Sequence, residues 1–256
     1  MLTERTLWGV IPDGFRKIID GRGSRLVVRE DRAGEIDFSI CRDDRVGTPD
    51  YRYQGRSLLE AIRLRDGDTA VVRRYRHGGL LRSVTRGCFC SWPPRPFREL
   101  AITEELRRRG LPTVEVYAAC VRCVGGPFYR GCLVTRELRG SKDLWAALQE
   151  DLAGRGALRS VLKATAEALR AMHREGVYHS DLNLKNILVR FRPDGVDGYV
   201  IDFDKAKLFL GKLPSPLVQK NLDRLRRSAL KLDPERRYLS ADSWHEFLEF
   251  YHGADA

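Results

Sequence analysis

Hydrophobic residues alternate with polar residues in short runs through the first half of the chain, which is typical of half-buried β-strands. Turn residues separate these runs, and the turn RDGD at 65–68 predicts a hairpin between the two runs beside it. One helix interrupts the strands over 95–110, with Pro96 in its first turn and Gly110 at its end. The predicted strands lie at 24–30, 35–41, 58–64, 69–75, 113–120 and 131–138.

From about residue 140 the apolar residues recur every three or four positions, which predicts helices. The longest such stripe runs over 158–172 and indicates a long buried helix. A shorter helix is predicted over 141–148, where Ser141 can cap the first turn. Two short strands around the turn RPDG then follow, and two helices close the chain at about 217–232 and 240–251.

The elements thus form a strand-rich first part, 1–139, with an extension over about 1–50, and a mainly helical second part, 140–256. With 256 residues and 43% hydrophobic content, the chain has a globular composition. Its net charge of +11 favours an anionic partner or substrate: nucleic acid, nucleotide phosphates or an acidic lipid surface. The sequence has no apolar run long enough to span a bilayer, and its first residues lack the features of a signal peptide. We therefore expect a cytoplasmic chain.

Six cysteines include a C-x-C at Cys88 and Cys90 and a C-x-x-C at Cys120 and Cys123. The second pair lies in a predicted strand, where residues three apart point to opposite faces and do not chelate one ion. We therefore expect reduced cysteines packed as small hydrophobic residues, in preference to a structural zinc site.

The segment YHSDLNLKNILV concentrates polar residues between the long helix and a strand. His179, Asp181 and Asn186 have the spacing H-x-D-x-x-x-x-N, and Asp202 follows the next strand in VIDFD. This order is typical of phosphoryl transfer, in which one carboxylate accepts a hydrogen bond from the attacking hydroxyl. An amide oxygen and a second carboxylate then hold Mg²⁺, which prefers oxygen ligands. Asp181 is the candidate base, Asn186 and Asp202 are candidate metal ligands, and Lys185 either contacts the γ-phosphate or is a solvated lysine.

These and other motifs resemble the protein-kinase-like superfamily and, within it, the lipopolysaccharide core kinases of the 3-deoxy-D-manno-octulosonic acid (Kdo) kinase family. The resemblance covers about 50–232 and rests on VVRRYRHGGLL, PPRPFRELAITEELRRRGLPTVEVYAA, YRGCLVTREL, YHSDLNLKNILV, IDFDKA and NLDRLRRSALK. It implies an α+β, two-lobed protein-kinase-like fold with a strand-rich N-terminal lobe and a mainly helical C-terminal lobe. It also implies ATP and Mg²⁺ as cofactors, and phosphorylation of a Kdo hydroxyl of the lipopolysaccharide inner core or lipid A precursor.

The family pattern also implies residues that contact the nucleotide phosphates. Gly55 in YQGRSLLEAI matches the phosphate-covering loop better than the glycine-rich segment DGRGSR at 20–25, which lies too far from the next motif. The usual kinase lysine is replaced by Arg73 or Arg74, and the alternative stays open because neighbouring strand residues face opposite ways. Glu99 in FRELAI matches the helix glutamate that pairs with that cation, with a surface glutamate as the alternative.

The segment TREL at 135–138, which contains Glu137, resembles the hinge whose backbone binds adenine. Asp204 stands where these kinases usually have a glycine after the metal-binding Asp-Phe pair. The arginines near 73–76 and 82–86 are candidates for contact with lipid phosphates and an anionic membrane surface. The resemblance therefore implies a peripheral enzyme on the cytoplasmic face of the inner membrane, with a Kdo-lipid A-like glycolipid as substrate.

Three alternatives remain at this stage. An atypical protein kinase is disfavoured because no APE-like element follows IDFD. A heptose-type lipopolysaccharide core kinase differs only in the acceptor sugar, and the sequence leaves the sugar and the hydroxyl open. An inactive nucleotide- or nucleic-acid-binding module is disfavoured because few aromatic residues interleave with the basic clusters, so we expect no nucleic acid partner. The sequence leaves the oligomeric state open.

Overall fold

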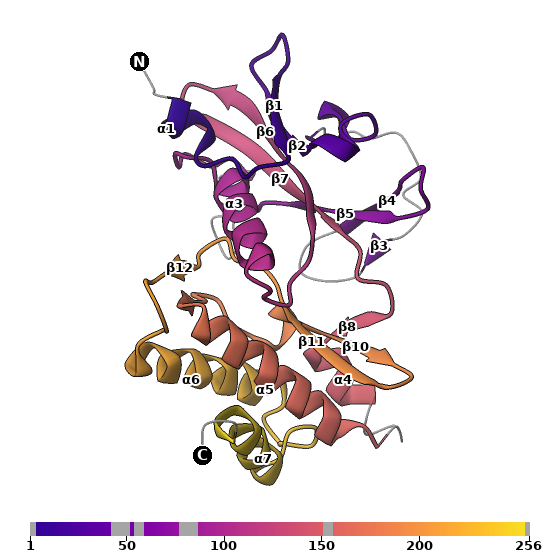
Figure 1. Ribbon diagram of the computed structural model, residues 1–256, viewed down its shortest axis with the longest axis vertical. Coiled ribbons are helices and arrows are strands. Elements are labelled where there is room, and N and C mark those ends of the chain that lie inside the picture. The colour runs from indigo at the N-terminus through magenta and orange to yellow at the C-terminus, as the bar shows by residue number, and fades with distance from the viewer. Residues whose placement is uncertain (1–3, 42–51, 54–58, 77–86, 151–155, 254–256) are drawn as a thin grey trace. The chain divides into compact units, whose positions relative to one another are not determined.

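The computed structural model describes residues 4–41, 52–53, 59–76, 87–150 and 156–253 (Figure 1). The chain forms two compact units. Unit 1 comprises Met1–Glu105 and Glu115–Glu137, and unit 2 comprises Leu106–Val114 and Leu138–Ala256.

Unit 1 is built on a seven-stranded antiparallel sheet with the strand order β1-β2-β6-β7-β5-β4-β3. The turn RDGD joins β4 to β5 in a hairpin, which confirms the sequence prediction. A short helix, α1 (Glu4–Trp8), precedes the sheet. The strands are β1 (Phe15–Ile19), β2 (Arg25–Arg29), β3 (Arg52–Tyr53), β4 (Leu59–Arg63), β5 (Thr69–Arg74), β6 (Val116–Gly125) and β7 (Phe128–Arg136).

Each face of this sheet buries its own set of apolar side chains. Helix α3 (Arg95–Arg108) covers one face, where Phe97 and Leu100 pack among residues of β2, β6 and β7. Two 3-10 helices, η1 (Glu30–Arg32) and η2 (Phe38–Cys41), belong to the other face, where Ile36 and Ile40 are buried. The two cores include side chains of β5 and of α3, so both elements are packed against the sheet's apolar faces.

The predicted strand at 35–41 is wrong, because part of this segment folds as η2. Asp37 favours the turn: its side chain accepts a hydrogen bond from the Ser39 N–H at 2.7 Å, and this competes with pairing in a sheet. Ile36 and Ile40 are four residues apart, which is a helical spacing rather than the alternation of a strand.

The prediction of reduced cysteines is also wrong for one pair, because Cys41 and Cys120 form a disulfide. The η2 turn places Cys41 over β6, with a Cα–Cα distance of 6.1 Å to Cys120. The two residues are 79 positions apart in the sequence, so inspection of closely spaced cysteines could not reveal the pair. Cys88, Cys90, Cys123 and Cys132 are not disulfide-bonded.

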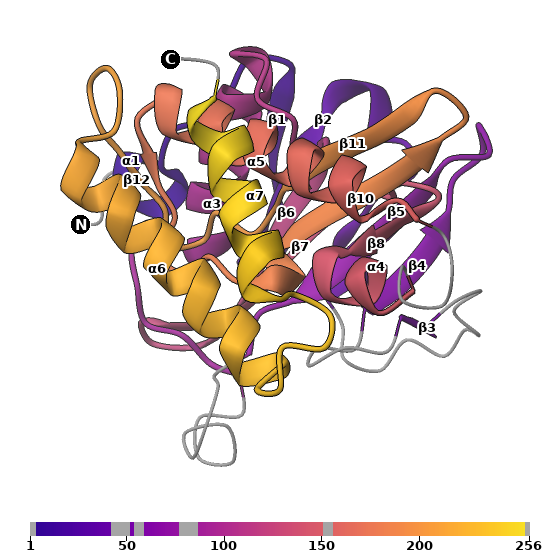
Figure 2. The ribbon, with the colours of Figure 1, turned by 90° about the horizontal axis from the view of Figure 1, so that it is seen from below.

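Unit 2 is mainly helical, with small sheets beside its long helix (Figure 2). Ser141 does not cap a helix as predicted; it lies in a strand, and Asp143 accepts the hydrogen bond from the Ala146 N–H at 2.8 Å. The helices are α4 (Leu144–Glu150), α5 (Leu158–Arg174), α6 (Ser215–Leu232) and α7 (Ala241–His252). The short elements are β8 (Ser141–Asp143), β9 (Val177–Tyr178), η4 (Leu184–Asn186), β10 (Ile187–Arg192), β11 (Gly195–Val200) and β12 (Lys207–Leu208).

Helix α5 forms the centre of unit 2, and its predicted apolar stripe is buried. It approaches β11 closely at Gly198, where a Cβ would lie 2.4 Å from the Ala164 carbonyl oxygen. Any larger residue at this position would push the β10–β11 hairpin away from α5. Across the described residues, no helix combines the length and apolar character needed to cross a membrane.

Candidate functional site

The polar loop singled out from the sequence follows β9, and His179 is the buried residue at its start, with 1% of its surface exposed. His179 Nδ1 accepts a hydrogen bond from the Asp181 N–H at 3.2 Å. Its Nε2 therefore carries the proton and donates to the Ile201 carbonyl oxygen at 3.0 Å. Burial lowers the pKa of His179, so the ring is neutral and fixes the backbone on both sides of it.

Helix α6 holds the same loop from a second direction. Asn221 is completely buried; its Oδ1 accepts the His179 N–H at 3.3 Å and its Nδ2 donates to the His179 carbonyl oxygen at 2.7 Å. Two helical turns later, the Ser228 hydroxyl accepts the Leu184 N–H at 3.3 Å. Sequence reasoning did not assign these two residues. The available signal was a polar Asn on the same face as the buried Leu222 and Leu225.

Asp181 and Asn186 are joined through the backbone. The carbonyl oxygen of Asp181 accepts hydrogen bonds from Asn186 Nδ2 and from Asn183 Nδ2, each at 2.8 Å. Because its nitrogen is used in this way, the Asn186 amide presents its oxygen as the group available to a cation. The Asp181 carboxylate is on an exposed residue, and Lys185, which follows η4's first residue, is exposed as well.

Asn186 and Asp202 come together at the end of the β10–β11 hairpin. The Ile201 N–H donates to the Asn186 carbonyl oxygen at 3.0 Å, and Asp202 is the next residue. Asp202 is half-buried and has a φ of +69°, in the left-handed region that non-glycine residues adopt at some cost. An amide oxygen and a carboxylate are hard donors, so these two residues fit Mg²⁺.

In unit 1, Arg73 on β5 and Glu99 on α3 form an ion pair. Glu99 is 2% exposed, so the alternative of a surface glutamate is excluded. Tyr75, which sequence reasoning did not single out, also donates to the Glu99 carboxylate, and the Arg73 guanidinium lies 4.9 Å from the centre of its ring. A buried carboxylate held by two donors keeps the Arg73 side chain in one position.

Arg74 points to the other side of β5. Its guanidinium contacts Glu60 and the Ile40 carbonyl oxygen, each at 2.7 Å. The two sequence candidates thus have different partners: Arg73 pairs with Glu99 on α3, and Arg74 pairs with Glu60 on β4. This follows from the alternation of side chains along a strand.

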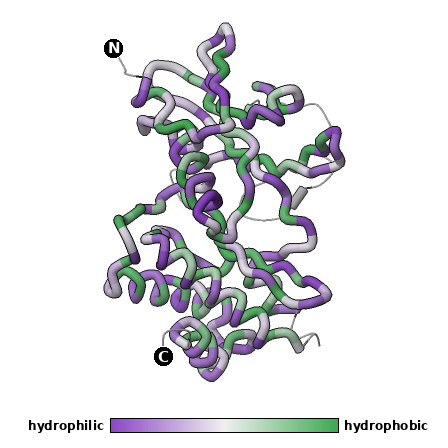
Figure 3. Tube along the Cα trace, in the orientation of Figure 1, coloured by the Kyte–Doolittle hydropathy of each residue, from purple (hydrophilic) through white to green (hydrophobic). Residues whose placement is uncertain are grey.

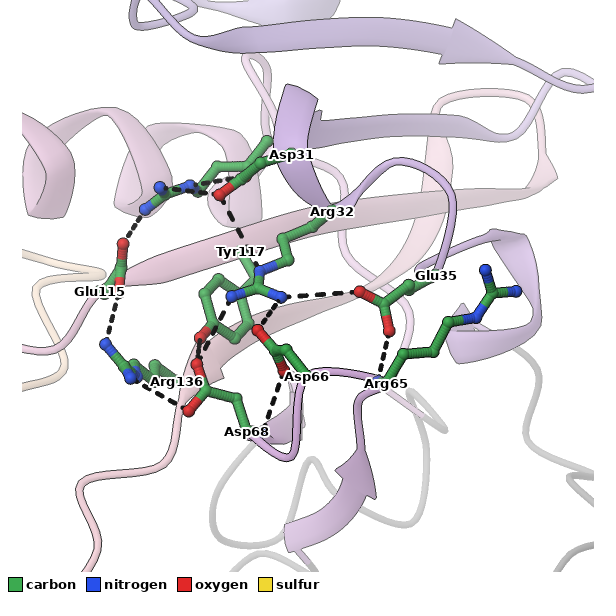
Figure 4. Close-up of polar contacts among 10 residues, drawn as sticks. Asp31, Arg32, Glu35, Arg65, Asp66, Asp68, Glu115, Tyr117 and Arg136 are labelled. Carbon is green, nitrogen blue, oxygen red and sulfur yellow. Dashed lines mark hydrogen bonds and ion pairs between the residues drawn. The ribbon is translucent and has the colours of Figure 1, made fainter.

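Glu137 follows β7, and its N–H donates to the Thr69 carbonyl oxygen at 2.8 Å. The neighbouring Arg136 belongs to a charged network in which it contacts Asp68 at 3.0 Å and Glu115 at 3.5 Å (Figure 4). Tyr117 donates to Asp68 at 3.0 Å, and burial together with this hydrogen bond raises the pKa of Tyr117 to about 12. The network holds the end of β7, directly before Glu137.

Two further sequence predictions concern glycine-rich loops. Gly55 lies outside the described residues. The other candidate, 20–25, is the turn between β1 and β2, in which Asp20 accepts the Arg22 and Ser24 N–H groups at 2.9 and 2.8 Å. The arrangement of the described residues therefore brings Asp181, Asn186 and Asp202 together within unit 2, and Arg73 with Glu99 within unit 1.

Comparison with known proteins agrees with this arrangement. The model of the lipopolysaccharide kinase (Kdo/WaaP) family matches residues 37–251. The 3-deoxy-D-manno-octulosonic acid kinase of Pasteurella multocida (strain Pm70) is 30% identical over 204 residues, 77% of this chain and 82% of that protein. The protein with the same description from Xanthomonas oryzae pv. oryzae (strain PXO99A) is 35% identical over 184 residues, 70% of this chain and 69% of that protein.

Among solved structures, WaaP in complex with acyl carrier protein has a TM-score of 0.50 at 22% identity, covering 79% of this chain and 77% of that one. This likeness confirms the predicted protein-kinase-like fold. The family match confirms the resemblance noted in the sequence and the prediction of a phosphotransferase. The polar loop after β9, the β10–β11 hairpin and the family match over residues 37–251 all agree. The chain belongs to the lipopolysaccharide kinase (Kdo/WaaP) family.

Proposed function

We propose that this chain transfers the γ-phosphoryl group of ATP to a hydroxyl of a Kdo residue in the lipopolysaccharide inner core or its lipid A precursor. The two relatives described above carry the name 3-deoxy-D-manno-octulosonic acid kinase, which supports Kdo as the acceptor. The single observation on which the chemistry rests is the loop His179–Asn186 with Asp202 beside its end. Together they supply an exposed carboxylate from Asp181, and an amide oxygen and a second carboxylate from two neighbouring segments of backbone.

In this proposal Asp181 accepts a hydrogen bond from the acceptor hydroxyl and orients it towards the phosphorus atom. Asn186 and Asp202 hold Mg²⁺ through their side-chain oxygens. Bound Mg²⁺ would offset the negative charge of the nucleotide phosphates. Lys185 is exposed on the same loop, and we assign it to the γ-phosphate. His179 and Asn221 keep the loop backbone in place without contacting substrate.

The residues of unit 1 bind the nucleotide. Arg73, oriented by Glu99, contacts the α- and β-phosphates, where its planar guanidinium can form two parallel hydrogen bonds. Gly55 belongs to the loop that covers the phosphates. The N–H of Glu137 is occupied by Thr69, so this residue would contact adenine through its carbonyl oxygen, which accepts from the amino group.

We also propose that the enzyme works at the cytoplasmic face of the inner membrane, because its acceptor is a lipid and its donor is ATP. The charge of +11 supports attraction to an anionic leaflet. Among the arginines predicted to provide this attraction, Arg73 is paired with Glu99 and Arg74 with Glu60, whereas Arg76 is exposed. Arg82 and Arg86 lie outside the described residues.

The test is phosphate transfer from labelled ATP with Mg²⁺ to four acceptors. Kdo-lipid A should be labelled, whereas lipid A without Kdo and a generic protein should not. A heptose-containing core lacking an accessible Kdo hydroxyl distinguishes the heptose-type alternative. Asp181→Asn is the matched inactive control. Labelling of lipid A without Kdo, or of the protein alone, would refute the proposal.

A further inference from the structure

The segment directly after the metal-site residue Asp202 exposes apolar side chains between lysines. Leu210 has its whole surface exposed, at 105% of the reference value, and Leu208 is 42% exposed. Lys205, Lys207 and Lys212 are exposed around them. A fully exposed leucine beside a half-exposed one is unfavourable in water, because contact of apolar surface with water costs free energy.

This segment is not a loose connection, because unit 2 holds it at both ends. Strand β12 pairs with β9, and the Phe209 N–H donates to the Gly176 carbonyl oxygen at 2.9 Å. After the exposed turn, the Leu213 N–H donates to the His173 carbonyl oxygen at 2.8 Å, and the Leu213 side chain is buried. Figure 2 shows the segment as a loop that projects near the N-terminal end of α6.

Gly176 makes this anchoring possible. Its φ is +71°, and a Cβ at this position would lie 2.3 Å from the Gly211 carbonyl oxygen and 2.5 Å from that of Phe209. Only glycine fits such a backbone approach in the left-handed region. The fold therefore holds the loop tightly against the end of α5 while Leu208 and Leu210 face away from the unit.

The charge around the loop is one-sided. From residue 205 to residue 220 the chain has four lysines and no acidic residue. Two acidic residues lie near the loop. Glu175, at the end of α5, is paired with Arg109 at 3.7 Å, and Asp204 directly precedes Lys205. Along the segment, drawn in Figure 3, three consecutive hydrophobic residues, Leu208 to Leu210, stand between lysines. Leucines flanked by lysines are the side chains that suit the boundary between lipid headgroups and acyl chains.

We infer that residues 205–212 form a membrane-docking loop, in which Leu208 and Leu210 enter the headgroup region of an anionic bilayer while Lys205, Lys207 and Lys212 contact lipid phosphates. This inference rests on the proposed function, since it places a lipid surface three residues from Asp202. The loop would bring the side of unit 2 that carries Asp202 towards the membrane in which the acceptor is embedded. It is a basic surface separate from Arg73 and Arg74, which are paired with Glu99 and Glu60.

The experiment is flotation of the full chain with vesicles, without ATP. Vesicles of phosphatidylglycerol and phosphatidylcholine should bind the parent at low salt, and binding should fall as salt rises; pure phosphatidylcholine vesicles should bind weakly. The double variant Leu208→Ser with Leu210→Ser should bind anionic vesicles about tenfold more weakly, because two apolar side chains no longer enter the lipid. The triple variant Lys205→Gln, Lys207→Gln, Lys212→Gln should bind anionic vesicles more weakly than the parent and show a weaker salt dependence.

Leu230→Ser is the matched control, because Leu230 is a partly exposed leucine on α6 outside the loop. It should bind vesicles like the parent. Melting curves show whether the leucines are needed for folding, and unchanged melting of the double variant is expected. Absence of vesicle binding by the parent, equal binding by parent and double variant, or a large loss of stability in the double variant would each overturn the inference.

The vesicle assay tests the docking loop and the acceptor assay tests the proposed function, so each can refute one proposal without the other. A chain that floats with anionic vesicles through the loop but labels no Kdo acceptor would retain the docking surface and lose the proposed function. A chain that labels Kdo-lipid A while the double variant floats normally would retain the function and lose the docking loop. A loop-dependent association with an acidic protein in place of lipid would also refute the inference.

Discussion

Asn221 holds the backbone of His179 from both sides, accepting its N–H at 3.3 Å and donating to its carbonyl oxygen at 2.7 Å. The asparagine is on α6, 42 residues after the histidine, and it is completely buried. One amide side chain thus satisfies two buried backbone groups at the start of the loop that carries Asp181. The position of the candidate base therefore depends on a residue of a different element, α6.

Asn221→Ala should lower both stability and turnover. Leaving the two His179 backbone groups unpaired should reduce the free energy of unfolding by about 1–3 kcal/mol, measured by urea denaturation. We expect kcat to fall by about tenfold or more with little change in KM for ATP, because the nucleotide contacts proposed for unit 1 are untouched. Gln219→Ala, an exposed change on the same helix, is the control and should alter neither quantity.

Asp181→Asn should lower kcat by about 10²–10⁴-fold, the usual contribution of a positioned acid or base. The affinity for ATP should stay nearly constant, because the carboxylate acts mainly on the acceptor hydroxyl in the transition state. Single-turnover kinetics and a fluorescent nucleotide titration measure the two effects separately. Turnover close to that of the parent would show that another group orients the hydroxyl.

Glu99→Gln should weaken ATP binding by removing the charge that orients Arg73. A change of about tenfold in KM for ATP corresponds to loss of one charge-assisted contact. The matched control is Glu60→Gln, which disrupts the equivalent pair with Arg74 on the opposite side of the same strand. Equal effects of the two substitutions on KM would mean that the Arg73 pair has no special role in nucleotide binding.

Asp202→Asn should reduce activity and the dependence of nucleotide binding on Mg²⁺, since a carboxylate ligand is replaced by a neutral amide. Asparagine tolerates the left-handed backbone at φ +69° nearly as well as aspartate. Melting of the nucleotide-free protein should therefore shift by only a few degrees, roughly the change for a polar surface residue. A much larger shift would indicate that Asp202 is chiefly a structural residue.

The free energy of unfolding should decrease as the pH is lowered from 6.5 to 4, because the chain contains buried histidines. Burial lowers the pKa of His173 to about 4 from its ordinary 6.5, and burial also lowers that of His179. In this window the unfolded chain binds more protons than the folded chain, so acid favours unfolding. For His173, lowering the pH from 7 to 5 should decrease the free energy of unfolding by about 2 kcal/mol, because one pKa unit corresponds to about 1.36 kcal/mol.

Urea denaturation at the two pH values measures this effect. His173→Gln can keep a hydrogen bond to the Tyr251 hydroxyl, which now lies 2.7 Å from His173 Nδ1, while removing the titrating ring. The variant should show a smaller loss of stability on acidification than the parent, with the remainder due in part to His179. An identical pH dependence in parent and variant would mean that His173 is not the source.

The order of elements and the chemistry of the candidate site followed from short-range patterns. The spacing of His179, Asp181 and Asn186, and the position of Asp202 after a strand, can be read from the chain itself. The long helix and the hairpin at 65–68 could also be predicted, because 3.6-residue and two-residue periods are local properties of a helix and a strand. The relation to known kinases rested on the same motifs.

Tertiary structure decided what depends on residues far apart in sequence. It selected Arg73 over Arg74 as the partner of Glu99, since the position of α3 relative to β5 determines which side of the strand meets the glutamate. It joined Cys41 to Cys120 and replaced a predicted strand with η2. It also brought Asn221 to His179. Hydrophobic periodicity fixes which face of an element is buried, but only the packing of the elements determines which buried polar groups become partners.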